Sequence, residues 1–233
     1  MWVTEVLPSS GERADAGTPE GRRWLAERYH RSESAYVRLN MIASLTGAAA
    51  GADGTSDTLT NRVDRAILGA IRADADVVLV GAQSVRAEGY LVPRHARLAI
   101  ASASGDLAGH RLTLDPDGPE DQVLLLLPDS ATAPGLAYGM TAVSVPGGER
   151  MTPASIVAAL CRRGLPRIVC EGGPSLASQF AEAGLIDEYC VTSAPALTPV
   201  ASAFLDLTRP VDTDAAGMLV DESGFSYLRL RRS

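Results

Sequence analysis

The chain has 233 residues, of which 46% are hydrophobic, and it carries a formal net charge of −7 at pH 7. This length and apolar content are typical of a folded globular protein, and the excess of acidic side chains argues against a nucleic-acid-binding surface. All 21 basic residues are arginines, which excludes a Schiff-base lysine and the lysine of a P-loop.

The cysteines and histidines show no spacing typical of a metal site. Cys161, Cys170 and Cys190 are odd in number and lack a C-x-x-C pair, so the sequence predicts neither a disulfide framework nor a bound metal. The N-terminus has no basic-then-apolar signal pattern, and no apolar run reaches membrane-spanning length. We expect a cytoplasmic protein without a membrane or nucleic-acid partner.

The predicted elements alternate along the chain. Residues 1–34 are polar and predict an arm, with a short helix over residues 20–29, that packs on a main domain of residues 35–233. Thr60 or Asn61 caps one further helix, and another begins at Thr152-Pro153 and ends near Gly164. Apolar runs indicate strands over residues 36–42, 76–81, 97–102, 122–127, 141–145, 167–171 and 188–194, and the alternating residues 225–231 add a late strand.

Apolar strands separated by helices are typical of an α/β protein. We expect a mostly parallel central sheet with helices on both faces, because strands buried on both sides read as continuous apolar runs. The final strands are expected to join antiparallel, since the chain that precedes them lacks a regular crossover helix.

One strand end has the features of an anion-binding turn. Glu171-Gly172-Gly173-Pro174-Ser175-Leu176 follows the apolar run Arg167–Cys170 and leads into a predicted helix. The glycines let a ligand approach the backbone, and the first N–H groups of the helix carry the positive end of its dipole. An ordinary glycine-rich turn is the alternative, but Glu171, Pro174 and Ser175 together favour a ligand site.

Polar side chains follow two other strands. Ser84 and Glu88 lie after the strand over residues 76–81, and helical spacing would place both on one face, where they could bind phosphate, amide or sugar groups. Ser44-Leu45-Thr46-Gly47 follows the first strand, and Ser56 lies in the loop beyond it. The alternatives are a short capped helix with Glu88 in water and an ordinary polar turn.

Two arginines are candidates for binding a phosphate. Arg72 comes late in a predicted helix, and Arg94 lies in a loop after Tyr90. A guanidinium binds a phosphate through two parallel N–H groups. The alternatives are that Arg72 interacts with the C-terminus of its own helix and that Arg94 is solvated.

Four segments, in this order, resemble the reductase domain of riboflavin biosynthesis, the C-terminal half of a bifunctional deaminase-reductase that also occurs as stand-alone pyrimidine reductases. They are Ser44–Gly47, Ile71–Asp76, Gly81–Glu88 and Glu171–Leu176, within a similarity over residues 36–231. The resemblance implies a dihydrofolate reductase-like fold and an NADPH-dependent reductase. Its substrate would be a ribosylaminopyrimidine 5′-phosphate, reduced at ribose C1′. The zinc signature of the deaminase half is absent.

The resemblance also implies roles for residues of this chain. Ser56, Arg72, Arg94 and Glu171 would face the substrate, with Arg72 on its phosphate and Glu171 as the catalytic group that polarises or orients it. The residues implied to contact NADPH are Ser84, Glu88, Gly172, Gly173, Pro174, Ser175 and Leu176. The family often forms homodimers, so the resemblance implies a homodimer here.

The chain departs from the family pattern at one turn. Thr46 stands where the family usually has an aspartate, which removes a negative charge near the implied site. Glu88 and Ser84 stand where the family commonly has Asp and Thr, and both keep the hydrogen-bonding type. Two alternatives therefore stay open: the same fold and cofactor with a pterin-like, folate-like or secondary-metabolite substrate, and a non-catalytic NADPH-binding protein.

Overall fold

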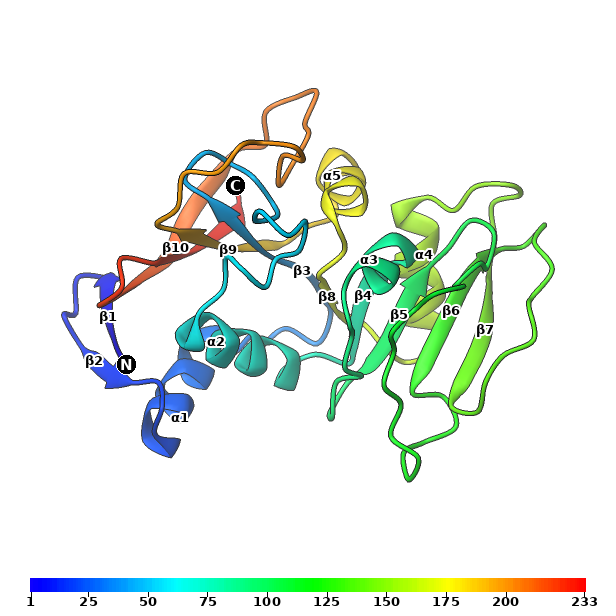
Figure 1. Ribbon diagram of the computed structural model, residues 1–233, viewed down its shortest axis with the longest axis horizontal. Coiled ribbons are helices and arrows are strands. Elements are labelled where there is room, and N and C mark those ends of the chain that lie inside the picture. Colours follow the sequence, from blue (N-terminus) through cyan, green and yellow to red (C-terminus); the bar gives the residue numbers. More distant parts are fainter.

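An eleven-stranded mixed sheet runs through the computed structural model, which describes residues 1–233. Its seven strands from β9 to β7 pair in parallel, and the remaining four pair antiparallel at one end (Figure 1). In spatial order the strands are β2 (Arg13–Asp15), β1 (Trp2–Leu7), β10 (Thr213–Asp221), β11 (Ser226–Arg232), β9 (Glu188–Ala194), β3 (Tyr36–Ser44), β8 (Arg167–Cys170), β4 (Val77–Gly81), β5 (Arg97–Ala101), β6 (Val123–Pro128) and β7 (Met140–Val145).

Helices cover both faces of the sheet. α1 (Pro19–Tyr29), α2 (Arg62–Ala73) and α3 (Ala82–Ala87) contribute to one apolar cluster, and α4 (Pro153–Arg162) and α5 (Pro174–Glu182) contribute to the other. Successive residues of β4 point alternately into the two clusters, which explains why this strand reads as an unbroken apolar run. None of the helices is long and apolar enough to cross a membrane.

These observations confirm the predicted α/β fold with a mostly parallel sheet, helices on both faces and antiparallel C-terminal strands. Each predicted strand and helix of the main body is present within one or two residues of its expected bounds. The side chain of Asn61 caps α2 by accepting a hydrogen bond from the backbone N–H of Asp64. At α4, Thr152 and Ser155 form a reciprocal capping box.

Three strands were not predicted from the sequence. β1 and β2 lie within the arm, and β1 pairs with β10, so the N-terminal residues extend the sheet at its antiparallel end. β10 itself is half-exposed over much of its length and contains Gly217, which gives it a weak apolar signal. The arm is therefore anchored by backbone pairing in addition to the packing of α1 against α2.

Candidate functional site

A cleft of about 1110 Å³ lies where β4, β5 and β8 end, between one face of α2 and the first turns of α3 and α5. In open α/β sheets, ligands bind in the crevice outside the carboxyl ends of the parallel strands. Ligand pockets are typically roughly 300–1,000 Å³, so this cleft is at the large end of the range. Ser56, Arg72, Ser84, Glu88 and residues 171–176 all line it.

Arg72 and Glu171 form a two-point ion pair in one wall of the cleft. Nε of Arg72 lies 2.8 Å from Oε1 of Glu171, and Nη2 lies 2.6 Å from Oε2. The carboxylate side chain is only 6% exposed, whereas the guanidinium side chain is 23% exposed. Because Nη1 of Arg72 makes no hydrogen bond to the protein, one guanidinium nitrogen stays available to a ligand.

Tyr90 completes this cluster. Its hydroxyl donates a hydrogen bond to Oε2 of Glu171 at 2.7 Å, and the Arg72 guanidinium lies 5.5 Å from the centre of its ring. Burial, reinforced by the nearby Glu171 carboxylate, raises the pKa of Tyr90 well above its ordinary value, so the phenol stays protonated and keeps donating. Both oxygens of Glu171 are thus engaged by protein donors, which favours a positioning role for this residue.

Ser56 and Glu88 are joined across the mouth of the cleft. The backbone N–H of Ser56 donates to Oε1 of Glu88 at 3.0 Å, and the Ser56 hydroxyl donates to the same oxygen at 3.1 Å. Glu88 follows the last turn of α3, and Ser56 lies in the glycine-rich loop between β3 and α2. The carboxylate therefore fixes this loop over the cleft, and it is not free in water.

The turn before α5 is held by Ser84. The Ser84 hydroxyl accepts a hydrogen bond from the backbone N–H of Gly173 at 3.1 Å, which links the first turn of α3 to the N-cap of α5. A Cβ atom on Gly173 would lie 3.0 Å from the same hydroxyl oxygen. The predicted neighbours Ser84 and Gly173 are therefore in direct contact in the cleft.

Gly172 and Ser175, in the same turn, have different roles. A Cβ atom on Gly172 would lie 2.6 Å from a methyl carbon of Leu176, so packing within the protein requires this glycine. The backbone N–H of Ser175, by contrast, makes no hydrogen bond to the protein. That free N–H at the start of α5 keeps the capacity for anion binding that the sequence predicts.

One face of α2 contributes three cleft residues at successive turns: Asp64, Leu68 and Arg72. Asp64 Oδ1 accepts from the hydroxyl of Thr192 at 2.6 Å, and Oδ2 accepts from the hydroxyl of Thr60 at 2.6 Å. Burial raises the pKa of the Asp64 carboxyl above its ordinary value, while these two hydrogen bonds oppose the rise. The sequence did not identify Asp64 as a site residue.

Thr46 does not line the cleft. Its hydroxyl lies 2.8 Å from that of Ser44, donates to the backbone carbonyl of Thr198 at 2.6 Å and accepts from the Thr198 N–H at 3.2 Å. Thr46 therefore ties the turn after β3 to the loop after β9. Its contacts are structural, and they do not favour the altered-substrate alternative that this substitution suggested.

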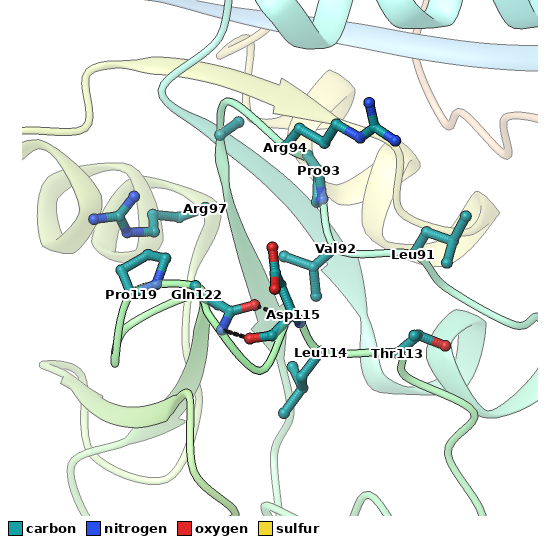
Figure 2. A pocket seen from close by; sticks show the side chains of 12 residues that line it. Leu91, Val92, Pro93, Arg94, Arg97, Thr113, Leu114, Asp115, Pro119 and Gln122 are labelled. Carbon is teal, nitrogen blue, oxygen red and sulfur yellow. Dashed lines mark hydrogen bonds between the residues drawn. The ribbon is translucent and has the colours of Figure 1, made fainter.

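Arg94 lies at a separate, smaller cavity of about 230 Å³. Figure 2 shows its side chain extending away from Asp115 and Gln122, whose mutual hydrogen bonds close the loop on the other side of that cavity. The structure thus brings Ser56, Arg72 and Glu171 to one cleft but does not bring Arg94 there. The prediction for Arg94 depended on the path of the loop after Tyr90, and this loop places Arg94 at the smaller cavity.

The buried cysteines do not offer a nucleophile. Burial raises the pKa of the Cys170 and Cys190 thiols to about 12, so both stay protonated at neutral pH. No group of three or more His, Cys, Asp or Glu side chains is arranged to hold a metal ion.

The family profile described as the RibD C-terminal domain matches residues 35–198, which cover most of the chain and all of the segments that line the cleft up to α5. The chain belongs to this family. A sequence comparison with curated proteins gives no match. The match begins just before β3, so β1, β2 and α1 precede the part of the chain that defines the RibD C-terminal domain.

Solved structures described as a pyrimidine reductase-like protein and as a riboflavin biosynthesis reductase share the fold. A pyrimidine reductase-like protein from Corynebacterium diphtheriae is 21% identical, with a TM-score of 0.67 over 85% of this chain and 92% of its own. The riboflavin biosynthesis reductase Rib7 from Saccharomyces cerevisiae is 13% identical, with a TM-score of 0.66 over 91% and 98%. These likenesses confirm the predicted dihydrofolate reductase-like fold.

A longer protein also matches. The deaminase/5-amino-6-(5-phosphoribosylamino)uracil reductase from Thermotoga maritima is 17% identical, with a TM-score of 0.70 over 85% of this chain. The alignment covers 57% of that protein, so this chain corresponds to little more than half of its length. The two share the fold over this region.

Asn40, Asp64 and Tyr90 are among the polar residues of the cleft that the sequence did not identify as site residues. Asn40 lies within β3, where the sequence shows only a strand. Asp64 reads as an ordinary acid in a helix's first turn. Strand and helix periodicity carry no signal for these contacts, because the three residues come together only when the fold brings their segments to the cleft.

Proposed function

We propose that this protein is an NADPH-dependent reductase that acts on a ribosylaminopyrimidine 5′-phosphate. The observation that carries the proposal is the joint presence, in one cleft, of a helix N-terminus with a free N–H at Ser175 and of Arg72 with an uncommitted Nη1. The helix N-terminus suits a diphosphate, and the Arg72 guanidinium suits a phosphate monoester. Membership of the RibD C-terminal domain family supports the same assignment.

The residues at the start of α5 fit a dinucleotide. Gly173 and Ser175 present backbone N–H groups towards the cleft, and the hydroxyl of Ser84 already bonds to one of them. That hydroxyl can rotate to donate to a phosphate oxygen, since Ser carries both a donor and acceptor lone pairs. NADPH, when bound, supplies the hydride for C1′, and the C1′–O4′ bond of the substrate opens while O4′ takes a proton.

The residues around Arg72 fit the phosphate end of the substrate. Glu171, itself bonded to Tyr90, holds the guanidinium plane, so that Nη1 has little freedom to lose when it binds a ligand. We propose that Glu171 acts through Arg72 as a positioning residue. Ser56 and Glu88 close the loop between β3 and α2 over the cleft and exclude water from the reacting carbon.

The proposed function is tested by following the loss of NADPH absorbance with a ribosylaminopyrimidine 5′-phosphate as the substrate. Steady turnover with NADPH supports it, and absence of turnover together with absence of NADPH binding contradicts it. Binding should be measured by calorimetry or by the shift in melting temperature. Trp2 and Trp24 do not line the cleft, so tryptophan fluorescence is not expected to report on the bound nucleotide.

A further inference from the structure

Glu88 borders both of the proposed ligands. Its backbone N–H donates to the carbonyl of Ser84 at 2.8 Å, and the Ser84 hydroxyl bonds to Gly173 at the turn where the diphosphate of the cofactor is proposed to bind. In a dinucleotide a ribose is attached directly to each side of the diphosphate, so a ribose lies next to this turn. The carboxylate of Glu88 meanwhile holds Ser56, in the loop that closes over the cleft.

The two oxygens of the Glu88 carboxylate are used unequally. Oε1 accepts both bonds from Ser56, at 3.0 Å from the backbone N–H and at 3.1 Å from the hydroxyl. Oε2 accepts no hydrogen bond from the protein, and the side chain is partly exposed and lines the cleft. A carboxylate oxygen has about two lone-pair sites, so Oε2 keeps its capacity to accept from a ligand hydroxyl.

The glycine-rich loop between β3 and α2 is held together from within. The N–H of Gly51 donates to the carbonyl of Thr55 at 2.9 Å, and the Asp53 carboxylate accepts from the Thr55 hydroxyl at 2.7 Å. The only hydrogen bonds from residues 50–58 to a segment beyond this loop are the two to Glu88. The loop can therefore move as one unit, and its hydrogen bonding across the cleft depends on one carboxylate.

Donors and acceptors run in one direction through this contact. Because the Ser56 hydroxyl donates to Oε1 of Glu88, its lone pairs are left for a hydroxyl of the substrate pentose. A ribose hydroxyl of the cofactor can donate to Oε2 of the same carboxylate. Hydrogen bonds linked in such a network polarise one another and strengthen together.

We propose that Glu88 couples the two ligand sites, holding Ser56 with Oε1 while Oε2 accepts from a ribose hydroxyl of the cofactor, so that each ligand raises the affinity for the other. This inference rests on the proposed function and adds a regulation of the same cleft. A bound cofactor fixes the Glu88 side chain, so the loop no longer has to order that side chain when the substrate arrives. The substrate produces the same gain for the cofactor, because binding linkage is reciprocal.

The first test measures the Kd of NADP⁺ by calorimetry, with and without a saturating ribosylaminopyrimidine 5′-phosphate. NADP⁺ carries no hydride, so the complex with both ligands does not turn over. We expect the substrate to lower the Kd of NADP⁺ at least about fivefold, and NADP⁺ to lower the Kd of the substrate by the same factor. Independent binding of the two ligands, or mutual weakening, would overturn the proposal.

The second test removes the hydroxyl that links the substrate to Glu88. In Ser56→Ala we expect the coupling factor to fall below about twofold, while the Kd of NADP⁺ alone changes by less than about threefold. Ser56→Thr keeps a hydroxyl and should retain more of the coupling. A folded Ser56→Ala variant with the wild-type coupling factor contradicts the inference.

Thr58→Ala is the matched control in the same loop. It removes a hydroxyl that bonds to Asp53 at 3.1 Å within the loop, and Thr58 does not line the cleft. This variant should keep the wild-type coupling factor. Equal losses of coupling in Thr58→Ala and Ser56→Ala would show that loosening of the loop is the cause, and the role of Glu88 would be wrong.

Hydrogen exchange at the Ser56 amide tests the contact without any substrate. This N–H donates to Glu88, so its exchange should slow at least about threefold when NADP⁺ fixes the carboxylate. The Gly51 amide, which bonds inside the loop, is the internal reference and should change less. Glu88→Ala should abolish the slowing at Ser56, and an unchanged exchange rate in the wild-type protein contradicts the inference.

The two levels of inference fail differently. If the wild-type protein binds neither NADP⁺ nor the phosphorylated substrate, the proposed function is wrong and the role of Glu88 falls with it. If it reduces the substrate with NADPH but binds the two ligands independently, the proposed function holds and only the coupling is wrong. If Ser56→Ala does not fold, the coupling factor and the amide exchange of the wild-type protein decide the question.

Discussion

The Arg72 guanidinium and the Glu171 carboxylate, 99 residues apart in the sequence, meet in a two-point ion pair in the wall of the cleft. The pair connects the last turn of α2 to the end of β8, and the hydroxyl of Tyr90 closes it from a third segment. Three elements that fold around the cleft therefore share one hydrogen-bonded cluster. Its single free nitrogen, Nη1 of Arg72, is the group on which the proposed phosphate contact depends.

Replacing Arg72 by Lys should weaken substrate binding more than cofactor binding. An ammonium cannot make the two-point contact with Glu171, and it leaves a carboxylate that is 6% exposed with one bond fewer. We expect KM for the phosphorylated substrate to rise by about tenfold or more, and stability to fall by about 1–3 kcal/mol. Steady-state kinetics and urea unfolding measure both effects, and an unchanged KM would remove Arg72 from the substrate site.

Arg65→Lys on the same helix is the control for stability. Arg65 and Asp57 form an exposed pair at 3.6 Å, so this change should alter the free energy of unfolding by no more than about 0.5 kcal/mol.

The bonds between Ser56 and Glu88 predict energetic coupling across the cleft mouth. Ser56→Ala removes the hydroxyl bond to Oε1, and Glu88→Ala removes the acceptor itself. In a double-mutant cycle, the loss of stability in the double variant should be smaller than the sum of the two single losses by about 0.5–1.5 kcal/mol. Strict additivity would show that the two residues are not in contact in solution.

Two glycines should respond oppositely to alanine. In Gly172→Ala the new methyl group would lie 2.6 Å from a methyl carbon of Leu176, so the Leu176 side chain at the start of α5 must shift, and we expect a loss of about 1–3 kcal/mol together with weaker NADPH binding. Gly69 lies within α2 with open space around it, so Gly69→Ala should stabilise the protein by roughly 0.5–1 kcal/mol. Thermal unfolding of both variants tests the comparison, and a destabilised Gly69→Ala would contradict it.

The thiols predict both a reactivity pattern and a pH dependence. Cys161 is exposed, whereas Cys170 and Cys190 are buried, so a chromogenic thiol reagent should titrate one thiol in the native protein and three after unfolding. The pKa of each buried thiol is about 12 in the folded chain against an ordinary 9.0. The unfolded chain therefore loses these protons first, and the free energy of unfolding should fall as the pH rises from 9 towards 12.

A stability that stays constant over that alkaline range would contradict the burial of these thiols. Cys161→Ser is the control for reactivity, because it should leave no reactive thiol in the native protein and two in the unfolded one.

The sequence predicted the parallel body of the sheet because its strands are buried on both faces, and it placed the helices from caps such as Asn61 and Thr152. It failed where strands are half-exposed. β10 has exposed residues at its start and a glycine in its middle, and β1 alternates over only a few residues. In such strands the pairing partner decides the structure, and β1 finds that partner at the other end of the chain.

At the cleft, the sequence located groups but not their partners. Arg72 and Glu171 were both expected to face the substrate, yet each is the other's main contact. Ser56 and Glu88 were assigned to different ligands, yet they bind each other. Residue type and position at a strand end predict which side chains gather, whereas distances between segments far apart in the chain arise only from the packed fold. Arg94 shows the same limit, since its place depends on the path of a loop.

The position of β3 between β8 and β9 has a consequence for how the polypeptide folds while it is synthesised. Arg38 on β3 is fully buried and donates to Glu188 on β9, 150 residues further along the chain. A nascent polypeptide that ends before β8 exposes both edges of β3 and an unpaired cation. The centre of the molecule is thus assembled only once most of the chain has left the ribosome, and partial chains are the species that need protection from aggregation.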